Sequence, residues 1–159
     1  MPLLPETNHA TVFTDGSCDT QICLGAWASI LFIGKEKIIL SGIEKNTTHN
    51  RMEIEAVIRA LDFLRKAYPE CLSVTVISDS QYVVNLGARK AKLIQKDFLT
   101  NSGKPIQNMD LVQKIFHFDS LLNVQYKKIK AHQKTDDTNY NIEADKIARA
   151  LVRETLAAT

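Results

Sequence analysis

The sequence is poor in cysteine, glycine and tryptophan, with three Cys, six Gly and one Trp among 159 residues. The cysteines, Cys18, Cys23 and Cys71, are odd in number and form no Cys-x-x-Cys pair. No nearby His or second Cys pair completes a metal site around Cys18 and Cys23. This pattern favours neither a disulfide framework nor a zinc site, so we expect buried or half-buried thiols in a reducing cytoplasm.

Long hydrophobic runs are also missing. The longest nearly uncharged apolar stretch, residues 22–34, is well short of the roughly 18 residues that a membrane span requires. Residues 1–10 have neither the positive region nor the apolar run of a signal peptide. We therefore expect a cytoplasmic protein with no membrane partner.

Charge of one sign is not in excess either, because 20 Lys and Arg stand against 18 Asp and Glu, a net charge of +2. Taken whole, this balance points to no charged partner. The length and the 45% apolar content suit one compact domain. We expect a tail over residues 1–9 and a single domain over residues 10–156.

The hydrophobic pattern predicts an α/β fold. Apolar residues rich in Val, Ile and Phe indicate strands, and a spacing of three and four residues between Ile54, Val57, Ile58 and Leu61 indicates a helix. The expected strands are residues 11–14, 24–33, 37–43, 72–78 and 122–130, and the expected helices are 50–67, 80–86, 90–99, 109–118 and 141–156. This order predicts a mixed five-stranded sheet, a three-strand antiparallel meander plus two parallel strands, flanked by helices.

Two carboxylates follow predicted strands. Asp15 ends the first strand and Asp79 ends the fourth. Neighbouring strands lie about 4.8 Å apart, so adjacent strands would bring the two carboxylates together at the edge where α/β sheets bind ligands. Taken singly, Asp15 could be a turn residue and Asp79 a helix cap.

Two further acids lie on the predicted helices. Glu53 precedes Val57 by four residues and falls on the buried stripe, whereas Glu55 lies on the outer face with Arg59. Asp145 borders the inner face near the start of the last helix. Several converging carboxylates would repel one another unless cations neutralise them. An all-oxygen ligand set favours Mg²⁺ or Mn²⁺, and such a cluster suits two-metal phosphoryl chemistry.

Five motifs make the chain resemble type 1 ribonuclease H. They occur in the family's order, cover about residues 10–155, and lie at residues 13–17, 48–53, 78–83, 130–133 and 143–149. The overall pattern is that of the cellular enzymes, and the segment 89–104 and the loop after His132 add features of retroviral-type forms. The predicted element order is also that of the family.

The resemblance implies a nuclease that hydrolyses the RNA strand of RNA/DNA hybrids and leaves 5′-phosphate and 3′-hydroxyl ends. It places Asp15 between two Mg²⁺ ions, with Mn²⁺ as an alternative. Glu53 and Asp79 would complete one metal site, and Asp145 would help to hold the other. His132 matches a loop histidine that assists proton transfer or product departure.

Substrate contacts follow from the same resemblance. Thr48 and Asn108 match a pocket for a phosphate of the DNA strand, and Asn50 and Gln81 match positions that read the minor groove. Glu53 would also meet an RNA 2′-hydroxyl. Asn50 and Asn108 could otherwise be ordinary turn or cap residues.

The chain departs from the family pattern at several positions. Residues 18–24 replace a glycine-rich stretch, and residues 90–99 match a basic protrusion but lack its frequent tryptophans. His49 stands in place of a common Asn, and Ala131 in place of Gly. We expect His9, His49 and His117 at the surface.

Three other functions compete with this interpretation. A haloacid-dehalogenase-like phosphatase would need its nucleophilic Asp where Phe13 stands. A module that grips hybrids without cutting would not need all four acids. A domain of a reverse transcriptase would share the chemistry, but Met1 and the closed set of elements favour a free-standing enzyme, which we expect to be a monomer.

The near-neutral total hides an uneven distribution of charge. Residues 86–134 hold ten Lys and Arg against three Asp, a local charge of +7, and the rest of the chain carries −5. A basic arm beside an acid-rich portion is compatible with a nucleic-acid partner.

Overall fold

The computed structural model describes residues 7–129 and 136–158. His132 and Ala131 lie outside the described residues, so the predicted loop histidine is not placed. In the described part of the chain, no helix is long and apolar enough to cross a membrane.

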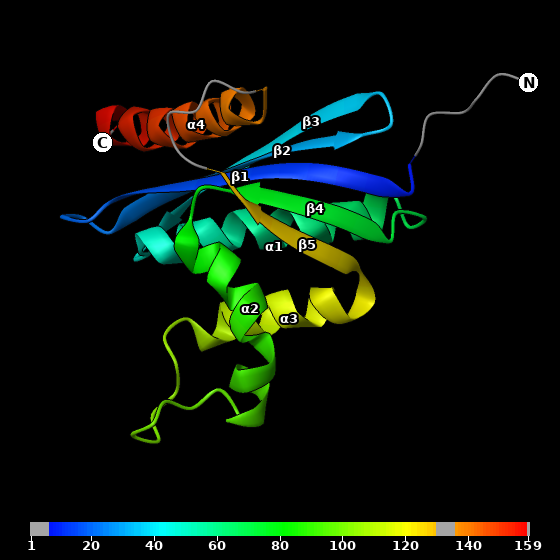
Figure 1. Cartoon of the computed structure of the whole chain (residues 1–159). Helices are drawn as coiled ribbons and strands as arrows, with labels where there is room; N and C mark the ends of the chain where they lie inside the picture. Colours follow the sequence, from blue (N-terminus) through cyan, green and yellow to red (C-terminus); the bar gives the residue numbers. More distant parts are fainter. Residues whose placement is uncertain (1–6, 130–135, 159) are drawn as a thin grey trace, which may run out of the picture.

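A five-stranded mixed sheet forms the centre of the molecule, in the order β3-β2-β1-β4-β5 (Figure 1). β1, β2 and β3 pair antiparallel, whereas β4 is parallel to β1 and β5 is parallel to β4. The predicted meander with two added parallel strands is therefore confirmed. The strands are β1 His9–Asp19, β2 Leu24–Ile33, β3 Glu36–Lys45, β4 Ser73–Ser78 and β5 Asn123–Lys128.

Helices cover both faces of the sheet. α4 packs on one face, and α1 lies against the other, with α2 and α3 beyond it (Figure 1). The two short helices expected over residues 80–99 are wrong, because one helix runs through both. The helices are α1 His49–Ala67, α2 Gln81–Gln95, α3 Met109–Leu121 and α4 Asp136–Ala158.

Two apolar cores fix the helices to the sheet. On the α1 side, the predicted stripe of Ile54, Val57 and Leu61 is fully buried against β1, β2 and β4. On the α4 side, Ala144 and Ala148 are fully buried against the strands, and their small side chains allow the helix to approach the sheet closely. Each buried branched side chain of the α1 stripe contributes about 1.5–3 kcal/mol to this packing.

β1 is longer than the sequence pattern predicts, and this changes the setting of Asp15. The strand does not end at Asp15 but continues to Asp19, with Asp15 paired to Ala28 of β2. The parallel ladder with β4 ends earlier, at the pair Phe13 and Ile77. Asp15 and Asp79 each lie two residues beyond that pair. The predicted end of the first strand is therefore wrong, but the expected proximity of the two acids is confirmed.

The last helix also begins earlier than expected. α4 starts at Asp136 and not near residue 141, so Asp145 lies in its third turn. The prediction that Asp145 is near the start of this helix is wrong. The prediction that Asp145 borders the inner face is confirmed, because Asp145 is half-buried next to the fully buried Ala144.

Candidate active site

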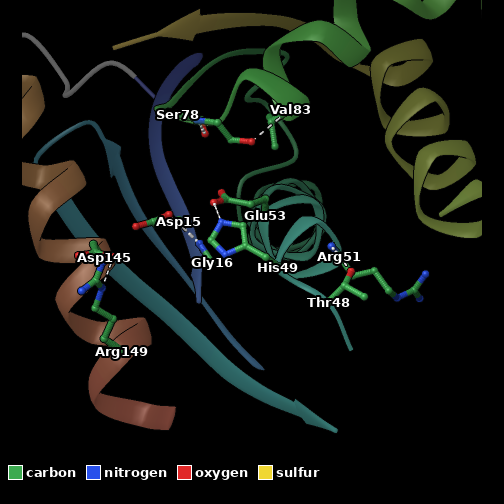
Figure 2. Close-up of polar contacts among 11 residues, drawn as sticks. Asp15, Gly16, Thr48, His49, Arg51, Glu53, Ser78, Val83, Asp145 and Arg149 are labelled. Carbon is green, nitrogen blue, oxygen red and sulfur yellow. Dashed lines mark hydrogen bonds and ion pairs between the residues drawn. The ribbon is translucent and has the colours of Figure 1, made fainter. Parts of the chain in front are cut away.

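Asp15 lies inside the sheet, with only 5% of its surface exposed. Its Oδ1 accepts a hydrogen bond of 2.9 Å from the backbone N–H of Gly16 (Figure 2). The alternative of a turn residue is wrong, because both neighbours of Asp15 pair with β2. A buried carboxylate in the middle of a strand gains little for the fold by itself, so its place indicates a chemical role.

Gly16 lets α1 approach the strand that carries Asp15. A Cβ atom at residue 16 would lie 2.7 Å from the backbone N of Glu53 and 2.7 Å from the backbone C of Met52. These distances are far below van der Waals contact, so only glycine allows this spacing. The close approach brings the first turns of α1 beside Asp15.

Glu53 points from α1 into the same space. The helix begins at the N-cap Thr48, whose side-chain oxygen accepts from the backbone N–H of Arg51 at 3.2 Å (Figure 2). Glu53 is 2% exposed, which confirms its predicted place on the buried stripe. In the described part of the chain, its Oε2 is buried without a hydrogen-bond partner.

His49 is the partner of Glu53 that the sequence did not reveal. Its Nε2 lies 2.9 Å from Glu53 Oε1 (Figure 2), and 57% of the His49 side chain is exposed. The expected surface exposure is confirmed, but the expectation lacked this contact. The spacing of four residues on one helix was the available signal.

Asp79 completes a group of three carboxylates. It directly follows β4, as predicted. The N-cap of α2 is Ser80 and not Asp79, because the Ser80 hydroxyl oxygen accepts from the backbone N–H of Val83 at 3.2 Å. The alternative of Asp79 as a helix cap is therefore wrong, and its side chain is left for the site.

The three acids are close enough to share a cation. One carboxylate oxygen from each of Asp15, Glu53 and Asp79 lies within 4.8 Å of the others. Burial, and then the charges of Glu53 and Asp79, raise the pKa of Asp15 to about 10. Burial also raises the pKa of Glu53, against the lowering effect of its hydrogen bond to His49. The electrostatics show that negative charge is crowded here in the absence of a cation.

Asp145 reaches the same cavity from α4. The cavity has a volume of about 420 Å³, and Asp15, Glu53, Asp79 and Asp145 all line it. Asp145 Oδ1 accepts a hydrogen bond of 3.0 Å from Nε of Arg149, one turn further along the helix (Figure 2). All four predicted acids are thus brought together.

This set of residues fits divalent metal ions. Glu53 Oε2 is buried without a partner among the described residues, and a cation would supply one. Every carboxylate of the group offers oxygen, the ligand atom that Mg²⁺ and Mn²⁺ prefer. A cation would also counteract the burial and the repulsion that together raise the pKa of Asp15.

A polar corner joins α1 to α3 close to Thr48. Arg51 donates to both carboxylate oxygens of Asp110, at 3.0 and 2.9 Å, and to Asn108 Oδ1 at 3.4 Å. The hydrogen bonds from Arg51 lower the pKa of Asp110 to about 2. Asn108 has a left-handed backbone with φ 59° and makes no side-chain cap bond, and its amide N–H donates to the Tyr82 hydroxyl at 3.1 Å.

None of the predicted substrate residues is among the described residues that line the acidic cavity. Thr48 and Asn108 flank Arg51 at the polar corner. Asn50 is exposed on the first turn of α1. Gln81 is exposed on the first turn of α2, directly after the Asp79 and Ser80 segment.

The mixed sheet, with carboxylates gathered just beyond the last pair of β1 and β4, and the family match together define the class of the protein as a nuclease. The chain belongs to the RNase H family, whose model matches residues 7–153. A protein named ribonuclease H from Caldicellulosiruptor saccharolyticus is 37% identical over 148 residues, covering 92% of this chain and 97% of that protein. Ribonuclease H of Chlorobaculum parvum is 37% identical over 147 residues, covering 91% and 95%.

The similarity extends to a further bacterial lineage. Ribonuclease H of Moorella thermoacetica is 34% identical over 146 residues, covering 91% of each chain. The relatives match the chain over almost its whole length, so the five motifs do not stem from a short shared segment. The recognition from sequence motifs is confirmed.

Proposed function

We propose that the protein is an endonuclease that hydrolyses the RNA strand of RNA/DNA hybrids and leaves 5′-phosphate and 3′-hydroxyl ends. The observation that carries the proposal is the group formed by the buried Asp15 and Glu53 carboxylates and the half-buried Asp79 carboxylate, with Glu53 Oε2 unpartnered among the described residues. Membership of the RNase H family supports the class of substrate.

Two divalent ions, Mg²⁺ or Mn²⁺, suit the acidic cavity. Asp15, Glu53 and Asp79 would hold one ion, and Asp15 with Asp145 would hold the other. When bound, these ions supply Lewis acidity for the attack of water and for the departure of the 3′ oxygen. The carboxylates contribute by fixing positions, since the sheet and α1 hold Asp15 and Glu53 almost free of solvent.

The residues around the cavity position the hybrid. Thr48 and Asn108 would bind a phosphate of the DNA strand, with Arg51 holding Asn108 in place. Asn50 and Gln81 would contact the minor groove, and Glu53 would meet an RNA 2′-hydroxyl beside the scissile phosphate. His132 would assist proton transfer or product departure.

We infer in addition that the protein acts as a monomer in the cytoplasm, within a catalytic domain over residues 10–156. The unpaired cysteine pattern of the sequence supports a reducing compartment. Size-exclusion chromatography with light scattering tests the monomer, and a mass twice that of the chain would overturn it.

A cleavage assay with end-labelled 20-base-pair duplexes of about equal stability tests the substrate. We expect cutting of the RNA strand of the hybrid with Mg²⁺ or Mn²⁺, no cutting of RNA/RNA or DNA/DNA, and no cutting with EDTA. Product ends are read by ligation and by phosphatase sensitivity. Equal cutting of the DNA duplex would overturn the proposal.

Asp15→Asn tests the metal site. Because the amide keeps the shape of the side chain but loses its charge, we expect cleavage to fall on the order of 10³-fold while hybrid binding persists. The matched control is Asp62→Asn, on the outer side of α1, where the carboxylate pairs with Lys66 at 2.9 Å. Full turnover by Asp15→Asn would contradict the assignment of the four acids.

A further inference from the structure

Lys128 lies at the carboxyl end of β5, one strand away from the acidic cavity. It pairs in register with Ser78, which precedes Asp79. Its ammonium Nζ donates a hydrogen bond of 2.6 Å to Oε1 of Gln81, on the first turn of α2. Both side chains are exposed, so the contact faces solvent at the edge of the sheet where the acids gather.

The Gln81 amide is held from two sides. Its Nε2 donates to Asn85 Oδ1 at 2.6 Å, one turn further along α2. Lysine carries only donors, so Lys128 fixes the amide with its oxygen toward the ammonium. The amide NH₂ group therefore points away from Lys128, and one of its two N–H bonds remains after the bond to Asn85.

We propose that Lys128 is a positioning residue that holds the Gln81 amide as a hydrogen-bond donor toward the minor groove of the hybrid. This inference rests on the proposed function, and it assigns to Lys128 a part in substrate recognition. The recognition takes place through Gln81 and not through a direct bond from Lys128 to the nucleic acid.

The chemistry of the minor groove explains why a donor is useful. Every base pair presents acceptors there, the N3 of purines and the O2 of pyrimidines, whereas only G·C pairs present a donor. An amide with its NH₂ outward can bond to any sequence. An amide with its oxygen outward would favour guanine, so Lys128 makes the contact independent of sequence.

Lys128→Met tests the proposal, because methionine keeps the length of the stem and removes the donor. The matched control is Lys35→Met, an exposed lysine in the turn between β2 and β3 with the same loss of charge. We expect Lys128→Met to raise KM about fivefold, as for the loss of one hydrogen bond, with kcat within about twofold of the wild type. Lys128→Arg, which also carries only donors, should restore KM.

A substrate change separates positioning from a direct contact. In a hybrid whose purines are replaced by 3-deazapurines and whose pyrimidines are replaced by C-nucleosides without O2, both minor-groove acceptors are lost. We expect this hybrid to raise the wild-type KM about fivefold and to leave the KM of Lys128→Met almost unchanged. Gln81→Ala should likewise abolish any effect of Lys128→Met.

Two outcomes would overturn the inference. An equal rise in KM for Lys128→Met on normal hybrids and on hybrids without these acceptors, with the salt slope of binding reduced by about one, would mean that Lys128 contacts a phosphate directly. No change in KM would mean that the Lys128 to Gln81 bond has no part in recognition. A wild type that cleaves neither hybrid would instead overturn the proposed function.

Discussion

Asp15 has a strongly raised pKa among the acids of the site. Burial, followed by the charges of Glu53 and Asp79, raises its pKa to about 10. The ordinary pKa of an aspartate is 3.8, so the metal-free folded protein binds a proton at Asp15 that the unfolded chain releases. The stability that Asp15 contributes is fully present below pH 3.8 and is lost as the pH rises toward 10.

Asp15→Asn should therefore stabilise the metal-free protein at neutral pH. Folding of the wild type requires Asp15 to take up a proton at this pH, whereas the amide requires none, and we expect a gain of about 2 kcal/mol at pH 8, or several degrees in Tm. The gain should be smaller at pH 5, because protonating Asp15 on folding costs less free energy closer to its ordinary pKa of 3.8. Thermal unfolding in EDTA at pH 5, 6.5 and 8 measures this difference.

The same variant should behave in the opposite way with metal. Saturating Mg²⁺ stabilises only the form that binds it, so wild-type Tm should rise and Asp15→Asn Tm should change little. Asp62→Asn serves as the control with a normal response to Mg²⁺. A gain for Asp15→Asn that is the same at every pH would contradict the role of ionisation.

At the scale of elements, the approach of α1 to β1 sets the geometry of the site. Gly16 is the point of contact, where an added Cβ would lie 2.7 Å from the backbone of Met52 and Glu53. Backbone atoms in a long helix cannot move aside as a flexible side chain can. A change at residue 16 therefore moves Glu53 relative to Asp15, although neither acid is altered.

Gly16→Ala should weaken folding and metal binding together. We expect a loss of about 2–3 kcal/mol in the free energy of unfolding, as for an overpacked core. Mg²⁺ affinity should fall about tenfold, because α1 is displaced from Asp15. Urea unfolding and calorimetric titration with Mg²⁺ measure the two effects.

Gly103→Ala is the control for Gly16→Ala. Gly103 has φ +81° and nothing within 4 Å of an added Cβ, so alanine there strains the backbone without a steric clash. We expect a cost of about 1 kcal/mol and unchanged Mg²⁺ affinity. An unchanged Mg²⁺ affinity in Gly16→Ala would show that the close approach does not set the metal site.

The elements also show what periodicity can and cannot reveal. The α1 stripe and the place of Glu53 followed from the spacing of apolar residues. The break expected between the helices 80–86 and 90–99 was wrong, because α2 runs through Gly87. Glycine usually weakens a helix by about 1 kcal/mol, so its place in α2 needs a reason. Here an added Cβ would lie 3.0 Å from the Tyr126 ring, so Gly87 lets α2 pass close to β5 without interrupting it.

Contacts between side chains were harder to predict than the positions of the acids. Asp15 and Asp79 could be found because each follows an apolar strand pattern. Glu53 and Asp145 could be found because they fall on or beside the inner face of a predicted helix. The partner of Glu53 was missed although the spacing of four residues pointed to it, because His49 is mostly exposed and the contact depends on its rotamer. The Lys128 to Gln81 bond joins residues 47 positions apart, and only the register of β4 and β5 reveals it.

At the scale of the whole molecule, opposite charges are segregated. Residues 86–134 carry a local +7, and the remaining residues carry −5. α2 contributes Arg89, Lys90 and Lys92 to the basic part, on the side of the fold away from α4 (Figure 1). A hybrid that enters the acidic cavity can therefore place its neighbouring phosphates beside α2.

The basic side chains of α2 should make hybrid binding depend on salt. Each Lys or Arg that neutralises a phosphate releases counterions and adds about 0.9 to the slope of log K against log salt. Arg89→Ala with Lys92→Ala should therefore reduce the slope by about two and raise KM, while kcat at saturating hybrid stays near that of the wild type. Fluorescence anisotropy between 50 and 300 mM KCl measures the slope. All variants in this measurement also carry Asp15→Asn, which prevents cleavage of the hybrid. The matched control is Lys35→Ala with Lys45→Ala, one in the turn before β3 and one at its last residue, which loses the same charge and should keep the slope. An equal loss of slope in both pairs would show that net charge, and not contact by α2, governs binding.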